Sequence, residues 1–236
     1  MLLFYAPDIS GHPQLPEPEA QHCLKVLRMQ VGDIVHITDG KGNFYKAAIA
    51  EAHPKHCRLD ILETIPQQPA WEGQIAIAVA PAKNIERTEW FAEKATEIGI
   101  DRIVFLNCRF SERKEIKPER INKVLISAMK QSLKARLPEL QAMTDFKKFI
   151  MQPFEGQKFI AHCYPGEKPL LSKVYHPNEN VLTLIGPEGD FSEEEIELAI
   201  NHGFVPVSLG ESRLRTETAA LTACQIIHIV NQMTEK

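Results

Sequence analysis

The sequence predicts an α/β protein in which a small β-rich unit precedes a larger domain built on a parallel sheet. A strong hairpin signal lies within residues 1 to about 70, and a proline-rich segment follows at Pro66–Pro69. After it, uninterrupted apolar runs alternate with helical patterns, which is typical of a parallel sheet covered by helices. The 236 residues suffice for one large or two small cores.

In the N-terminal unit, the clearest signal is a β-hairpin. Strands are expected at Ile34–Thr38 and Phe44–Ile49, on either side of the turn sequence Asp39-Gly40-Lys41-Gly42. Arg58–Leu62 predicts a further strand. Glu17–Met29 predicts a short helix, because prolines stand near its start and proline is favoured in a first helical turn.

The second part begins with Ile75–Ala80, an apolar run expected of a strand buried on both faces. Arg87–Ile98 then predicts a helix closed by Gly99, and Pro118 opens another that runs to about Leu133. Further strands are expected at Ile103–Leu106, Phe159–Ala161, Val181–Ile185 and Val205–Leu209.

Two polar runs near the C-terminus, Leu184–Ser192 and Leu209–Ala220, each couple a tight turn to polar groups at the start of a helix. Such an arrangement can hold a polar ligand against backbone N–H groups. No Lys-Ser or Lys-Thr follows Gly189, so the first run is no P-loop, and the glycines do not make the dinucleotide fingerprint. The runs therefore predict a small-molecule site of another type, built from two loops of one sheet.

Helix-capping signals explain only some residues of these runs. Ser192 with Glu195 predicts a capping box, and Thr216 or Thr218 is expected to cap the final helix. Helix capping accounts neither for Gly186-Pro187-Glu188-Gly189 nor for Arg215 and Glu217, which stand two residues apart before a helix. For those we predict a functional role.

The composition favours a soluble cytoplasmic protein. Apolar content of 44% and charged content of 25% are ordinary, and no apolar stretch approaches the roughly 20 residues of a membrane span. No signal peptide is expected at the N-terminus. Five scattered cysteines without a Cys-x-x-Cys pair predict reduced thiols. No metal site and no membrane partner are expected.

The charge distribution is uneven. Residues 109–136 carry nine basic and three acidic side chains, a balance of +6, whereas residues 188–197 carry six acidic and no basic ones, a balance of −6. A basic face beside a ligand site suits a polyanion such as RNA. On charge alone, however, a solvated helix face explains the basic stretch better.

Together these motifs resemble the SPOUT-class RNA methyltransferases, and within them the 16S rRNA (uracil-1498-N3) methyltransferase family. That family shows an Ile-Gly-Pro-Glu-Gly-Gly run and a later Leu-Gly-x-x-x-Leu-Arg-x-Glu-Thr-Ala run, which stand here at Ile185–Asp190 and Leu209–Ala219. Here Asp190 replaces the second glycine and Ser212-Arg213 a usual basic-then-apolar pair. The resemblance spans nearly the whole chain, through His22 with Val26–Arg28, Pro81-x-Lys83, Lys94–Gly99, Ser111–Arg113 and Gln131–Pro138.

The resemblance implies a PUA-like RNA-binding β-barrel at residues 1–68 and a SPOUT methyltransferase domain at residues 72–236, whose sheet ends in a deep trefoil knot. It implies a homodimer and S-adenosylmethionine as the cofactor. The cofactor-binding residues would be Leu184, Ile185, Gly186, Pro187, Glu188, Gly189, Leu209, Gly210, Leu214, Thr216, Thr218 and Ala219.

For catalysis, we expect Arg215 to polarise a uracil carbonyl or hold a phosphate, and Glu217 to position Arg215 or accept a proton. The alternative is a mutual salt bridge between the two that braces the knot. The partner implied is 16S rRNA within the assembled 30S subunit. The expected RNA-binding residues are Lys25, Arg28, Lys83, Arg109, Arg113, Lys134 and Arg136.

Two other functions stay open on the sequence. One is a SPOUT methyltransferase acting on a different RNA, such as tRNA or 23S rRNA. The other is a non-catalytic ribosome-assembly factor that binds RNA.

Overall fold

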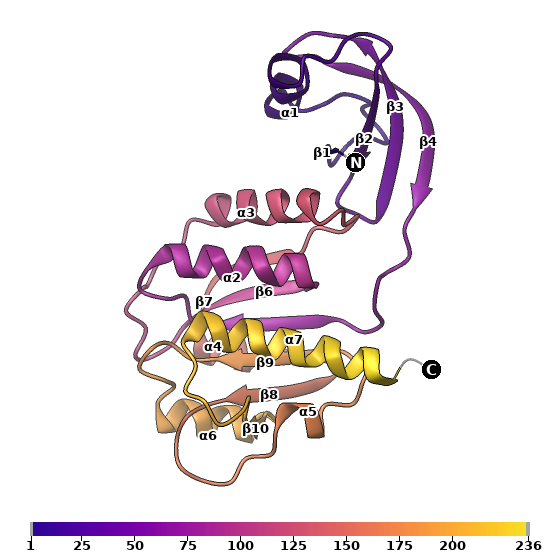
Figure 1. Ribbon diagram of the computed structural model, residues 1–236. Helices are drawn as coiled ribbons and strands as arrows, with labels where there is room; N and C mark the ends of the chain where they lie inside the picture. The colour runs from indigo at the N-terminus through magenta and orange to yellow at the C-terminus, as the bar shows by residue number, and fades with distance from the viewer. Residues whose placement is uncertain (1, 235–236) are drawn as a thin grey trace. The chain divides into compact units, whose positions relative to one another are not determined.

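The computed structural model describes residues 2–234, which divide into two compact units (Figure 1). The first unit contains the residues up to Ala70 together with Ile126–Leu137, and the second contains Trp71–Leu125 and the residues from Pro138 onward. Helix α3 (Pro118–Gln131) therefore contributes to both units. This contribution is absent from the domain limits expected from the sequence, which stay a prediction.

The first unit is a four-stranded sheet with a small core. Its strand order is β1-β2-β3-β4, with β1 parallel to β2 and the others antiparallel. The predicted hairpin is confirmed as β2–β3, because Val35 and Ile37 alternate toward the core. The strands are β1 (Leu3–Tyr5), β2 (Ile34–Thr38), β3 (Asn43–Glu51) and β4 (Arg58–Pro66).

The predicted helix at Glu17–Met29 starts where expected but ends early and changes type. Helix α1 (Glu17–Gln21) continues as the π-helix η1 (His22–Val26). The N–H of Leu27 donates to His22 O at 3.0 Å, five residues back, and Arg28 then adopts a φ of +58°. A left-handed residue cannot continue the helix, so the chain turns there.

Asp39 organises the loop of the β2–β3 hairpin. Its Oδ1 accepts hydrogen bonds from the backbone N–H groups of Lys41 (2.7 Å) and Asn43 (3.0 Å). Its Oδ2 accepts from the Asn43 side-chain amide (2.7 Å) and the Tyr45 hydroxyl (3.2 Å). Burial by itself raises the pKa of the Asp39 carboxyl, but these hydrogen bonds to the charged form outweigh burial and hold the pKa below its ordinary value.

We expect Asp39→Asn to lower the free energy of unfolding by about 1–3 kcal/mol near neutral pH, because an ionised acceptor is lost. Since the folded pKa is lowered, the carboxylate stabilises fully above the unfolded pKa of about 3.9, and its contribution is lost as the pH falls through the folded pKa. Urea unfolding of both proteins should therefore differ near neutral pH and converge below about pH 4. A difference that stays constant down to about pH 3 would contradict this account.

The second unit is a six-stranded sheet in which every neighbouring pair of strands is parallel, as the sequence predicts. The strand order is β10-β8-β9-β5-β6-β7. β5 and β9 are buried along their whole length, as expected of central strands. The strands are β5 (Ile75–Val79), β6 (Arg102–Asn107), β7 (Glu139–Asp145), β8 (Gln157–Ala161), β9 (Val181–Ile185) and β10 (Val205–Val207).

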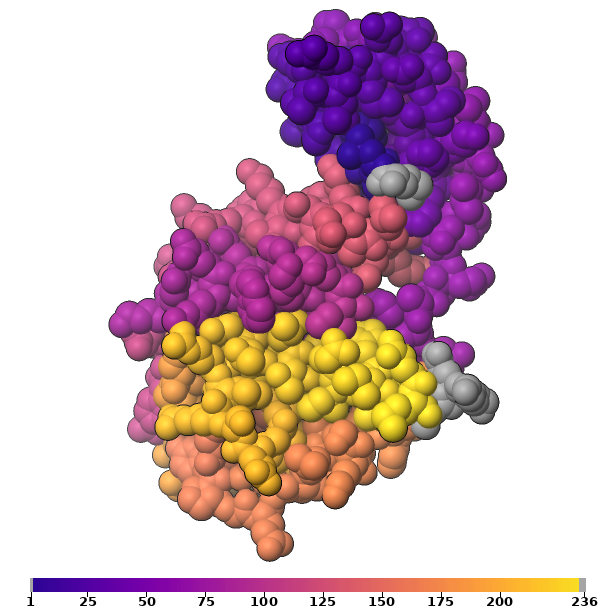
Figure 2. All heavy atoms as spheres, in the orientation of Figure 1, coloured from indigo at the N-terminus to yellow at the C-terminus, as the bar shows by residue number. Residues whose placement is uncertain are grey.

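Helices cover both faces of this sheet. On one face α7 (Thr216–Thr234) lies between α2 (Ile85–Ile98) and the short α5 (Leu171–Val174), as Figures 1 and 2 show. On the other, α4 (Phe146–Ile150) packs against α6 (Glu193–Asn201) over a core of alternate strand residues such as Ala78 and Leu184. No helix among residues 2–234 is long and apolar enough to cross a membrane.

The predicted capping box of α6 is confirmed. Ser192 Oγ accepts from the backbone N–H of Glu195 at 3.3 Å, and Glu195 Oε2 accepts from the N–H of Ser192 at 2.9 Å. Helix α2 begins at Ile85, two residues before the predicted start at Arg87, because Asn84 is the N-cap and its side chain accepts from the N–H of Glu86.

Candidate functional site

Two central strands of the second unit, β5 and β9, end side by side. Val79 of β5 and Ile185 of β9 are register partners, and the N–H of Ala80 donates to Ile185 O at 3.0 Å. From here the chain leaves β5 toward β6 on one side and β9 toward β10 on the other. In open parallel sheets, ligands bind outside the carboxyl ends of the strands at such a switch point.

The first polar run forms a tight turn directly after β9. The N–H of Asp190 donates to Pro187 O at 2.9 Å, and Asp190 adopts a φ of +66°. Aspartate tolerates this left-handed conformation better than most residues, so it can stand where the resembling family has glycine. Asp190 Oδ2 also accepts from the N–H of Cys163 at 2.7 Å, which ties the turn to the segment after β8.

A hydrogen bond joins the two polar runs. The buried Thr216 donates from Oγ1 to Gly186 O at 3.1 Å. Helix α7 begins at Thr216, so Thr218 lies inside its first turn and the hydroxyl of Thr216 reaches across to β9. The expectation that one of these threonines caps the helix is therefore wrong. The runs lie together because Thr216 bonds to the opposite loop.

The segment after β10 leaves open space at Gly210. The N–H of Gly210 donates to Ser208 Oγ at 3.2 Å, and Gly210 has a φ of +135°. A Cβ atom added to Gly210 would meet no atom within 4 Å, whereas one added to Gly186 would meet Phe191 at 3.1 Å. The loops are thus packed on one side and open on another, which fits a ligand held largely by backbone groups.

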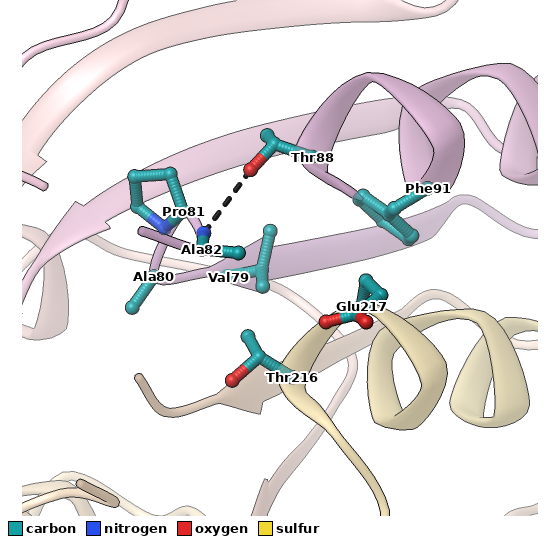
Figure 3. Close-up of a pocket in the computed structure, with 8 residues that line it drawn as sticks. All are labelled: Val79, Ala80, Pro81, Ala82, Thr88, Phe91, Thr216 and Glu217. Atoms are coloured by element: carbon teal, nitrogen blue, oxygen red, sulfur yellow. Dashed lines mark hydrogen bonds between the residues drawn. The ribbon is translucent and has the colours of Figure 1, made fainter. Parts of the chain in front are cut away.

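Figure 3 shows a small pocket between the end of β5 and the first turns of α2 and α7. Glu217 as a whole residue is only 9% exposed, and its carboxylate lies among the groups that line the pocket. The hydroxyl of Thr88 accepts from the N–H of Ala82 at 3.1 Å and fixes α2 to the β5 loop. The lining residues are Val79, Ala80, Pro81, Ala82, Thr88, Phe91, Thr216 and Glu217.

The two expected catalytic residues do not contact each other as an ion pair. Arg215 is exposed, whereas Glu217 is buried and its Oε1 lies 3.8 Å from Nη1 of Arg87 on α2. Residues two positions apart at a helix start face different directions, so Glu217 turns toward α2. The hypothesis of a mutual salt bridge is therefore wrong, whereas a role of Glu217 in positioning Arg215 stays a prediction. Arg87 was missed, although recognising Asn84 as an N-cap would have placed it in the first turn of α2.

Three of the expected RNA-binding residues lie on loops at this edge of the sheet. Arg113 donates from Nε to Ala82 O (3.1 Å) and from Nη2 to Lys83 O (2.6 Å), so its guanidinium braces the β5 loop. Lys83 Nζ pairs with Glu112 at 2.6 Å. Arg109 Nη1 pairs with Glu194 at 3.0 Å. The last two pairs are largely exposed and such pairs contribute little to stability, so both cations are open to exchange with another anion.

Glu188, expected to bind the cofactor, holds the neighbouring loop through its side chain. Its Oε1 accepts from the backbone N–H of Lys83 at 2.8 Å. Leu184, Ile185 and Pro187 are buried, and Gly189 is exposed. Leu209, Leu214, Thr218 and Ala219 are half-buried.

The remaining expected RNA-binding residues belong to the first unit. Lys25 and Arg28 are exposed, Arg136 donates from Nη1 to Lys41 O at 3.2 Å, and Lys134 is half-buried. Beside them, Lys130 pairs with Glu19 at 2.6 Å, an ion pair that fastens the end of α3 within the same unit.

The sequence is similar to those of known RNA methyltransferases. The sequence profile of an RNA methyltransferase domain matches residues 69–228, and that of an RNA methyltransferase PUA domain matches residues 15–62. A protein of Synechocystis sp. named Ribosomal RNA small subunit methyltransferase E is 28% identical over 232 residues, which cover 94% of this chain and 75% of the relative.

Solved structures share the fold over the full length. The crystal structure of a "probable rRNA-methyltransferase" from Porphyromonas gingivalis superposes with a TM-score of 0.94, at 47% identity and 99% coverage of both chains. The crystal structure of a Ribosomal RNA small subunit methyltransferase E from Neisseria gonorrhoeae, bound to S-adenosyl methionine, superposes with a TM-score of 0.86, at 26% identity and 98% coverage of both chains. Because the domain profile spans residues 69–228, more than half of the sequence, the chain belongs to the RNA methyltransferase family.

Proposed function

We propose that this protein transfers a methyl group from S-adenosylmethionine to N3 of a specific uridine in 16S rRNA, of the m3U1498 type. The hydrogen bond from Thr216 to Gly186 is the observation that carries this proposal, because it unites both polar runs at the switch point of the sheet. Relatives named Ribosomal RNA small subunit methyltransferase E, one of them bound to S-adenosyl methionine, support the substrate and the cofactor.

The loops fit the cofactor. Backbone groups at Leu184–Gly189, Leu209–Gly210 and Leu214–Ala219 would hold it, with Gly210 offering the open space that a Cβ would fill. When bound, S-adenosylmethionine supplies an electrophilic methyl group, so that the electron pair of N3 forms the new C–N bond while the S–C electrons stay on sulfur.

The chain's own residues must align the base and remove its imide proton. N3 lies on the Watson–Crick edge, so the uridine has to be unpaired or flipped out before it can react. Arg215 is exposed at the start of α7 and would polarise a uracil carbonyl or hold a phosphate. Glu217, a buried carboxylate in the adjoining pocket, would accept the N3 proton.

The wider assembly is part of the same proposal. Residues 1–68 would form a PUA-like RNA-binding domain, and residues 72–236 a SPOUT domain whose C-terminal elements are tied in a deep trefoil knot. The protein would act in the cytoplasm as a homodimer on the assembled 30S subunit, with the exposed Lys25 and Arg28 and the loop cations Lys83 and Arg109 contacting RNA. The match of a PUA profile to residues 15–62 supports the first of these assignments.

Loss of one modification tests the function. In a strain that lacks this gene, 16S rRNA should lose one N3-methyluridine, which the purified protein and S-adenosylmethionine should restore to 30S subunits. Persistence of every N3-methyluridine in 16S rRNA would refute the assignment. Loss of a methylated base from tRNA or 23S rRNA would favour a different RNA target, and failure to bind S-adenosylmethionine in calorimetry would favour an assembly factor.

A further inference from the structure

Glu217 is a buried carboxylate in a setting that offers it little polar support. The pocket around it is lined mostly by apolar groups of Val79, Ala82 and Phe91 (Figure 3). An ionised carboxylate in such surroundings is costly unless a charge or a dipole compensates it. Its place in the first turn of α7 supplies one source, because helix N-termini favour negative charge.

The second source of compensation comes from another helix. Arg87 Nη1 lies 3.8 Å from Glu217 Oε1, and among residues 2–234 it is the cation that forms an ion pair with this carboxylate. Arg87 stands in the first turn of α2, which Asn84 caps. The dipole of α2 disfavours a cation there, so helix formation does not account for an arginine at this position.

The distance between the Arg87 guanidinium and the Glu217 carboxylate leaves the carboxylate able to accept a proton. At 3.8 Å the guanidinium attracts the carboxylate without a hydrogen bond of ordinary length, so acceptor positions on the carboxylate stay free. The Arg87 side chain is 40% exposed and that of Glu217 10%, which places the cation at the rim of the pocket and the carboxylate inside. The neighbouring Thr88 anchors this turn of α2 to the β5 loop.

We propose that Arg87 is a positioning residue for methyl transfer: it holds the Glu217 carboxylate directed into the pocket, where Glu217 takes the N3 imide proton of the uracil. The proton moves from N3 to a carboxylate oxygen of Glu217, and the electron pair left on N3 becomes the nucleophile. This inference rests on the proposed function and adds to it a residue that itself touches neither the base nor the cofactor.

The test is a double-mutant cycle on kcat with 30S subunits as the substrate. Arg87→Met, which keeps an unbranched apolar side chain but removes the guanidinium and its charge, should lower kcat about tenfold or more while the Kd for S-adenosylmethionine stays within about twofold. Arg87→Lys should restore most of the activity. In a Glu217→Gln background, Arg87→Met should cause no further loss, because the two residues act through one step.

A second measurement, which needs no cofactor, is a crystal structure of the variant. In the crystal structure of Arg87→Met without cofactor, the Glu217 carboxylate should turn away from the pocket. Arg102→Met is the matched control, since it removes an Arg–Glu pair of 3.6 Å at the amino end of β6, and it should leave kcat unchanged. If Arg87→Met is too unstable to purify, Arg87→Gln replaces it with the same expectations.

Three results would overturn the inference: a kcat within twofold of wild type in Arg87→Met, losses that multiply with those of Glu217→Gln, or a Glu217 carboxylate unmoved in the crystal. A wild-type protein that methylates no uridine would instead refute the proposed function, and the crystal structure would still decide whether Arg87 holds Glu217 in place.

Discussion

Arg215→Ala should reduce methyl transfer by roughly 10²–10³-fold, as expected when a group that stabilises developing charge is removed. Arg215 is exposed at the first turn of α7, and it forms no ion pair with another of the described residues 2–234. Its guanidinium is therefore available to a uracil carbonyl or a phosphate. Because the cofactor would be held mainly by backbone groups, calorimetry should find its Kd changed by no more than about threefold.

Arg213→Ala is the matched control for this substitution. Arg213 is an exposed arginine two residues earlier on the same segment, and it has no role in the proposed chemistry. The control should retain near-normal turnover. Equal losses in both variants would mean that the segment needs only positive charge, and normal turnover in Arg215→Ala would remove Arg215 from the catalytic step.

Gly210→Val should weaken the binding of S-adenosylmethionine by about 100-fold or more, which corresponds to about 2.7 kcal/mol. The φ of Gly210, +135°, is one that a β-branched residue rarely adopts, so the loop must change its conformation. The new side chain would also occupy the open space that we assign to the cofactor. Calorimetry of the purified variant measures the loss directly.

Gly166→Val separates backbone strain from loss of the site. Gly166 has a φ of +125° and no atom within 4 Å of an added Cβ, so its backbone strain matches that of Gly210. It lies on the segment after β8, outside the predicted cofactor loops. Both variants should lose similar stability in urea unfolding, but only Gly210→Val should lose the cofactor. Equal affinities in the two variants would place the cofactor elsewhere.

Elements with strong local signals were predictable from the sequence. The bounds of β9 were predicted as Val181–Ile185, because a short apolar run between polar segments is typical of a central strand in a sequence where strands and helices alternate. The capping box at Ser192 was equally clear, since its partners stand three residues apart. Such features depend on neighbours in the chain, and the sequence displays those neighbours directly.

Elements without a periodic pattern were missed. The edge strand β7 (Glu139–Asp145) is largely polar, and α4 spans only Phe146–Ile150, so neither offers a buried face long enough to recognise. Their formation depends on the sheet and the core against which they pack. The contribution of Ile126–Leu137 to the first unit likewise follows from contacts with residues distant in sequence.

The sequence by itself determined the class of the molecule: an all-parallel second sheet, a hairpin-based first unit, and two polar runs that point to one ligand site. The tertiary structure decided which groups meet there. In the folded chain Thr216 donates a hydrogen bond to Gly186, and Glu217 forms an ion pair with Arg87 and not with Arg215. The guanidinium of Arg113 donates to the backbone of the β5 loop. Strand and helix patterns repeat over a few residues, whereas these partners lie 30 to 130 residues apart and become neighbours only when the parallel strands align their carboxyl ends.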